Sequence, residues 1–174
     1  VASNTTATVT PSGSVIVSTQ ATLGASGTLT FSWDASNPLI GLVAVGATGT
    51  TAEKTMTAIK AVAVNENADV TMIKFSLTGG SAADFATNGI KLYQKVGSVA
   101  EKLIGSADMI STSATFNFDP GTLVIEKSKT NVLIVKALFN GTSNGVAAND
   151  PPAIDFADAT NANDDTYITA KGSS

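Results

Sequence analysis

Residues 27–33 read GTLTFSW, and this short stretch decides how the rest of the chain is interpreted. Its odd-numbered positions from 29 onward carry Leu, Phe and Trp, while Thr or Ser stands between them. Because successive side chains of a β-strand point to opposite faces, the pattern predicts a strand with one packed face and one hydroxyl-bearing face. The same alternation predicts that Trp33, the only tryptophan, lies in the core.

The same two-residue period recurs along most of the chain, interrupted by Gly, Asn, Asp, Ser or Pro. Residues 54–64 contain several Ala, but Thr55, Thr57 and Val62 favour a strand over a helix there. A single helical turn is expected at residues 81–86, and an acidic loop at residues 149–165. The expected strands span residues 6–10, 14–21, 27–33, 38–45, 54–64, 70–78, 90–95, 100–105, 114–118, 122–126, 131–139 and 166–170.

These strands predict an all-β fold, an antiparallel Ig-like or jelly-roll β-sandwich of about nine to eleven strands. A chain of 174 residues is one domain by default and is long enough to bury a substantial core. We therefore expect a sandwich domain at residues 21–174, preceded by an N-terminal strand arm at residues 1–20.

The amino-acid composition lacks the side chains on which most catalytic sites depend. The chain has no His and no Cys, which excludes disulfides, thiolate zinc sites and the commonest general base. The ten basic residues are all Lys and stand singly, with a net charge of −4, so nucleic-acid binding is not expected. The four Glu are predicted at turns or strand ends, so no paired-carboxylate site is expected. We expect no enzymatic activity.

The chain begins Val1-Ala2-Ser3-Asn4 without a Met. A cleaved secretory signal peptide would leave such a start, although a shortened chain would look the same. No apolar stretch is long enough to span a bilayer, so membrane insertion is not expected. The expected location is extracellular, at the cell surface.

The N-terminal arm carries two alternating apolar pairs, Ala7 with Val9 and Val15 with Val17. In one interpretation, both pairs belong to ordinary first strands of the same domain. In the other, the arm leaves its own domain and completes the sheet of a neighbouring copy. Donated strands bind through main-chain hydrogen bonds and fit through alternate side chains.

The acidic loop is the only candidate metal site. Asp155, Asp158, Asp164 and Asp165 lie close together in the sequence. Calcium prefers such oxygen ligands, but the spacing does not match an EF-hand loop, and a solvated loop is the simpler interpretation. No other cofactor is expected.

Two triplets fit the pattern for N-linked glycans. They begin at Asn4 and Asn140. Such triplets also arise by chance in a chain that is rich in Thr, so the pattern identifies candidates only.

Several segments of residues 60–139 have a familiar pattern. They are AVAVNENADV at 61–70, IKFSLTG at 73–79, IKLY at 90–93, LVI at 123–125 and VLIVKA at 132–137. This pattern resembles Ig-like sandwich modules of prokaryotic surface-layer and stalk proteins. It is also similar to subunits of donor-strand-complemented extracellular filaments of archaea and bacteria.

The resemblance covers about half of the chain. Surface modules usually occur in tandem, whereas this chain holds one, so the resemblance favours a polymerising subunit. The chain lacks the long apolar helix of type IV pilins and the disulfide common in chaperone–usher pilins.

Together these observations predict a structural subunit of an extracellular filament or pilus. It would polymerise noncovalently with copies of itself by N-terminal donor-strand complementation. The alternative is a surface-layer or adhesion module that could bind carbohydrate, with glycans or neighbouring cell surfaces as partners.

Overall fold

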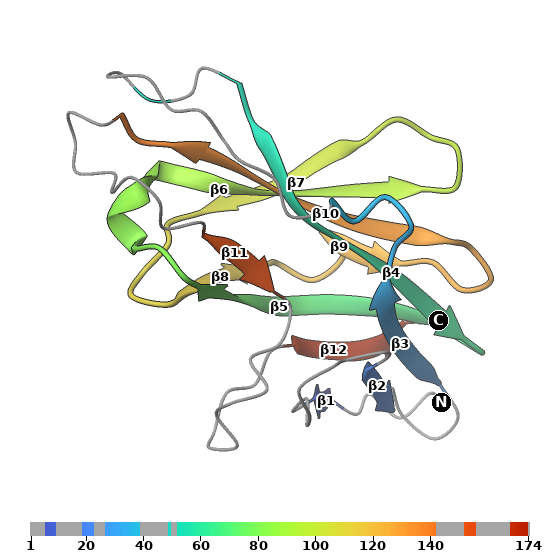
Figure 1. The fold of residues 1–174 in the computed structure, drawn as a ribbon. Helices are drawn as coiled ribbons and strands as arrows, with labels where there is room; N and C mark the ends of the chain where they lie inside the picture. The colour runs from blue at the N-terminus through green and yellow to red at the C-terminus, as the bar shows by residue number, and fades with distance from the viewer. Residues whose placement is uncertain are drawn as a thin grey trace.

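The computed structural model describes residues 6–9, 19–22, 27–38, 49, 52–141, 152–155 and 168–173. Within these residues the chain forms twelve β-strands and one 3-10 helix, and the named strands pair antiparallel. The strands lie in two layers, sheet A and sheet B (Figure 1). The prediction of an all-β antiparallel sandwich is confirmed.

Sheet B is organised around β10 (Asn131–Phe139). Its strand β10 pairs with β4 on one side and with β6 on the other. Leu133, Val135 and Ala137 alternate along β10 and are fully buried, as expected for a central strand that faces a second sheet. The order across sheet B is β2 (Thr19–Thr22), β3 (Thr28–Trp33), β4 (Lys54–Val64), β10 (Asn131–Phe139), β6 (Phe85–Val96) and β7 (Lys102–Ala107).

Sheet A is organised around β5 (Asn67–Thr78), its longest strand. Along one edge of β5 lie β8 (Ser113–Asn117) and β9 (Leu123–Ile125). Along the other edge lie β11 (Ala153–Asp155) and β12 (Ile168–Ser173). β1 (Thr6–Val9) pairs with β12 and lies at the outside of the sheet.

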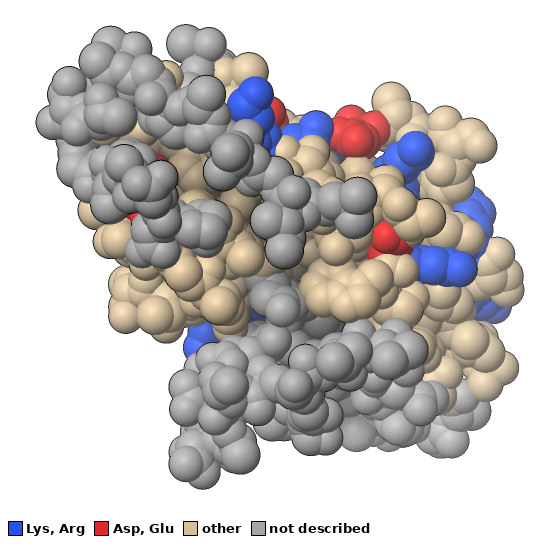
Figure 2. Space-filling model, in the orientation of Figure 1, with Lys and Arg blue, Asp and Glu red and all other residues tan. Residues whose placement is uncertain are grey.

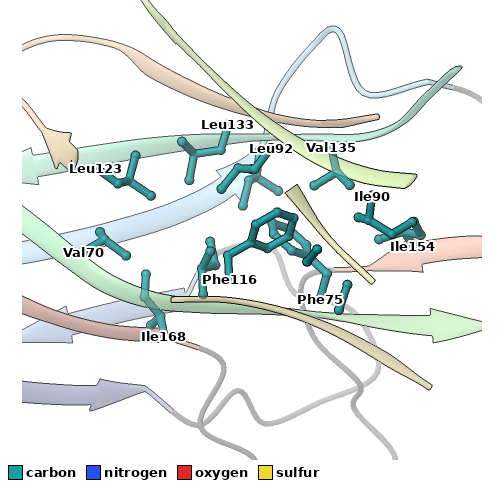
Figure 3. Packing of buried hydrophobic residues seen from close by; sticks show 14 of the residues in the cluster. Val70, Phe75, Ile90, Leu92, Phe116, Leu123, Leu133, Val135, Ile154 and Ile168 are labelled. Atoms are coloured by element: carbon teal, nitrogen blue, oxygen red, sulfur yellow. The ribbon is translucent and has the colours of Figure 1, made fainter. Parts of the chain in front are cut away.

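The core fills the space between the two sheets. Leu92 and Leu133 point inward from sheet B, and Val70 and Phe75 meet them from sheet A (Figure 3). The rings of Phe75 and Phe116 pack edge to face, with centroids 6.0 Å apart. Burying an aliphatic or aromatic side chain of this size contributes about 1.5–3 kcal/mol, so this layer is the main source of stability.

Trp33 is not in the core, contrary to the prediction. Trp33 is 40% exposed, although Leu29 and Phe31 on the same strand are buried. Trp33 is the last residue of β3, and the neighbouring strand β2 pairs only with residues 28–31. Trp33 lies opposite Ile59 of β4, but among the described residues it has no partner strand on its other side.

Two further expectations concern connecting segments. The predicted helical turn is confirmed as a 3-10 helix, η1 (Ala82–Asp84), which is capped by the hydroxyl of Ser81. The acidic segment 149–165 is not entirely a loop, because β11 lies within it and pairs with β5. The expected strand at residues 38–45 lies almost entirely outside the described residues.

Candidate assembly site

The first and last described strands of the chain lie side by side in sheet A. β1 pairs with β12, with Ala7 opposite Ala170 and Val9 opposite Ile168. Ile168 and Ala170 are 0% and 1% exposed, so this face of β12 belongs to the core. Both strands therefore lie in sheet A, in the order β1–β12–β5.

The N-terminal arm divides between the two sheets. β1 pairs with β12 at the outside of sheet A, and β2 pairs with β3 at the outside of sheet B. The candidate interface residues Ala7 and Val9 lie on β1, whereas Val15 and Val17 lie outside the described residues. In the single chain β1 completes its own sheet. The same register with β12 of a neighbouring copy would be strand donation.

The predicted calcium ligands lie mostly outside the described residues. Asp155 is the last residue of β11 and is paired with Ser76, while Asp158, Asp164 and Asp165 are not described. Within the described part of the chain, no three His, Cys, Asp or Glu side chains are grouped so that they could hold a metal ion. Calcium binding by the acidic segment therefore stays a prediction.

Of the two candidate glycan sites, Asn4 lies outside the described residues, and Asn140 follows β10 directly. The Asn140 side-chain nitrogen donates hydrogen bonds to the carbonyl oxygens of Ala83 and Phe85, at 2.8 and 2.7 Å. Its backbone N–H donates to the carbonyl of Asp84 at 2.8 Å. Asn140 thus holds the η1 turn against the end of β10, and a glycan would replace one of the amide hydrogens that do this.

The outer face of sheet B carries a row of apolar side chains across four strands. Ile134 lies opposite Ala58 on one side and Tyr93 on the other, and Tyr93 lies opposite Leu103. Ala58 and Ile134 are buried, whereas Leu103 is 48% exposed. The row therefore becomes more accessible toward β7.

An ionic network crosses the same face beside this row. Glu53 accepts hydrogen bonds from the Lys91 ammonium at 2.6 Å and from the Tyr93 hydroxyl at 2.7 Å. Lys136 donates to Glu101 at 2.6 Å and lies over the Tyr93 ring, 4.5 Å from its centroid. These groups satisfy one another across β6 and β10.

The network shifts two ionisation equilibria. Hydrogen bonds from Lys91 and Tyr93 lower the pKa of Glu53 below its usual value. The hydrogen bond to Glu53 raises the pKa of Tyr93 from 10.0 to about 12, so its phenol stays protonated at alkaline pH values where a free tyrosine ionises. The face thus presents mixed, paired charge. In Figure 2 red and blue atoms are interspersed over the upper right of the molecule. Sequence inspection missed this network, because its members meet only once the strand register is known.

Comparisons with known proteins add no relative. No family model, no curated protein and no solved structure matches the chain. In the part of the chain that the structure describes, no helix has the length and apolar character needed to cross a membrane.

Proposed function

We propose that the chain is a secreted structural subunit of an extracellular filament or pilus, without catalytic activity. It polymerises noncovalently by giving its N-terminal strand to a neighbouring copy. One observation carries the proposal: β1 lies at the outside of sheet A and, among the described strands, pairs with β12 alone. A terminal strand in this position can move to a neighbour while β12 stays paired with β5.

The register supports donation by main-chain hydrogen bonding. Four consecutive residues of β1, from Thr6 to Val9, are aligned with residues 171 to 168 of β12. Once β1 is removed, the edge of β12 has unpaired main-chain groups, and such an edge favours pairing with another chain. Because donor and acceptor are different surfaces, each copy both gives and receives, and the assembly is an open chain of subunits.

The outer surfaces suit close packing between copies. The outward positions of sheet A include Thr115, Asn117 and Thr169, and the outer face of sheet B carries ion pairs that satisfy each other. Charged residues make up 14% of the chain, below the typical share of about 25%. Repulsion between neighbouring copies is correspondingly low.

Deletion of residues 1–17 tests the proposal, because it removes β1 and leaves β2. The truncated chain should stay soluble and β-rich but form no fibres in negative-stain electron microscopy. A synthetic peptide of residues 1–17 should bind it and raise its unfolding temperature. Val9→Asp in the full chain should weaken assembly, because it would place an unpaired charge opposite the buried Ile168 of β12.

A scrambled peptide of the same composition is the control. If the truncated chain unfolds outright and neither peptide binds, β1 is an internal strand and donation of the arm is refuted.

The exposure of Trp33 favours a second candidate function. An accessible indole ring at the end of β3 is a platform on which a sugar ring can stack. We therefore also consider a surface-layer or adhesion module that binds carbohydrate. Because Trp33 is the only tryptophan, its fluorescence reports on this site alone. A saturable change with cell-surface glycans, lost in Trp33→Ala, would favour this function, and an unchanged spectrum across glycans would rule it out.

A further inference from the structure

Strands β11 and β12 are two parts of one interrupted ladder along β5. Asp155 at the end of β11 lies opposite Ser76, and Ile168 at the start of β12 lies opposite Ile73. Ser76 and Ile73 also both pair with β8, which takes up the other edge of β5. β11 and β12 therefore share a single edge.

The connection between β11 and β12 is far longer than the distance between the ends that it joins. Ser76 and Ile73 are three positions apart on β5, which corresponds to about 10 Å at about 3.3 Å per residue. The chain uses the twelve residues 156–167 to join them. An extended chain of that length spans about 40 Å, so β12 is tethered with several times the reach that its own position requires. Lengthening a connection costs little free energy, because the closure term grows only with the logarithm of its length.

β12 occupies an interior position of sheet A and contributes side chains to the core. It lies between β5 and β1, with six residues aligned with β5 and four with β1. Ile168 and Ala170 point into the core, opposite Ile73 and Val70, which are both 0% exposed. Without β12, the edge of β5 and these core residues would form an open groove.

The shape and pairing of this groove restrict which strand can fill it. A filling strand must pair with β5 over this length and place an Ile and an Ala two residues apart in the core. The β12 strand of a second copy meets both requirements, because it is the same sequence in the same register. The pairing of β12 with β5 would keep its register, and the connection would reach a second copy.

We propose that β12 is exchanged between copies, so that the C-terminal strand of one chain fills the place beside β5 of the next. This inference rests on the proposed self-assembly, but it assigns a second donor strand that is independent of β1. It adds a core-forming link to the edge pairing made by the N-terminal strand.

Disulfide trapping tests the exchange, because the chain has no Cys of its own. Met72 and Thr169 are cross-strand partners of β5 and β12. Directly opposite residues have Cα atoms about 4.5–5.5 Å apart, within the range that a disulfide accepts. Full-length Met72→Cys and Thr169→Cys chains with different tags are unfolded, mixed, refolded, assembled and oxidised. Exchange makes the covalent heterodimer the main oxidised product on a non-reducing gel.

A matched control uses the other edge of β5. Asn117 on β8 is also opposite Met72, and β8 is not a terminal strand. The mixture of Met72→Cys and Asn117→Cys chains should give no heterodimer, whereas the double variant Met72→Cys/Asn117→Cys should close within one chain.

The outcomes separate the two proposals. Fibres without a 72–169 heterodimer overturn β12 exchange and leave the proposed filament function intact. A 72–169 heterodimer in a closed dimer that forms no fibres supports the exchange and overturns the filament. Monomers in which the double variant Met72→Cys/Thr169→Cys closes only within one chain overturn both.

Discussion

Amide side chains satisfy the backbone at several points where strands end. The Asn37 side-chain oxygen accepts hydrogen bonds from the backbone N–H of Ala58 at 2.7 Å and from the Thr57 hydroxyl at 3.0 Å. The Asn131 side chain, which is fully buried, donates to the carbonyls of Glu126 and Lys129, both at 3.1 Å. Buried backbone groups are costly when unpaired, so these residues hold irregular segments in one conformation.

We expect Asn140→Ala to destabilise the fold by about 1–3 kcal/mol, because two backbone carbonyls of the η1 turn lose their donors. Urea denaturation measures the change. Asn117→Ala, at an exposed position of β8, is the control and should change stability little.

A second variant distinguishes the structural role of the Asn140 hydrogen bonds from a role as a glycan site. Thr142→Ala removes the glycosylation triplet while keeping the Asn140 amide. If Thr142→Ala protein produced in the native host has a lower mass and lower stability than the wild type, Asn140 carries a glycan. Hydrogen bonding to the η1 turn is then not its main role.

We expect the Glu53 ion pair to make stability depend on pH at the acid end. The folded-state pKa of Glu53 lies below its usual value of 4.5. Its contribution is therefore present above pH 4.5 and is lost as the pH falls through the lower folded-state pKa. The contribution should be about 1 kcal/mol or less, because the pair is partly exposed.

Comparison of wild type with Glu53→Gln in urea at several pH values measures this effect. The difference in stability between them should shrink as the pH falls below 4.5. A difference that stays constant across the acid range would mean that the Glu53 charge contributes nothing.

At the scale of elements, the two terminal strands play different parts. β1 adds to an edge, while β12 lies between two strands and contributes buried side chains to the core. β12 completes the hydrophobic layer, and β1 covers its outer edge.

We expect Ile168→Ala to cost about 2–5 kcal/mol, because it leaves a cavity opposite Ile73 in the core. Thr169→Ala, one residue further on and partly exposed, should cost much less. Chemical denaturation of both variants, under conditions where the chain is monomeric, makes the comparison. Equal losses would mean that β12 does not have its inward face in the core.

At the scale of the whole molecule, the main source of stability is the apolar core between the two sheets. Two six-stranded sheets enclose a continuous apolar core. Residues 156–167, which include Asp158, Asp164 and Asp165, join two strands that both pair with β5. A cation bound by this segment would therefore add to the fold without being its foundation.

We expect a chelator to leave the β-sheet circular dichroism spectrum unchanged and to lower the free energy of unfolding by at most a few kcal/mol. Thermal scans with and without the chelator, and with calcium added back, measure this. Collapse of the fold on chelation would show that the acidic segment is structurally essential.

The sequence alone determined the fold class and much of the strand pattern. The predicted strands at residues 54–64 and 131–139 coincide with β4 and β10, because long alternating runs have one apolar face that must be buried. The local sequence was enough to predict these two strands, because successive side chains of a strand always point to opposite faces.

Only the tertiary structure decided which strands are neighbours and how deeply each side chain lies. Trp33 shares the inward face of β3 but is exposed, since depth depends on how far neighbouring strands extend. β11 is too short to show a period and exists because β5 offers an edge there. The Glu53–Tyr93 contact and the central place of β12 likewise depend on the register between distant segments, which no local pattern encodes.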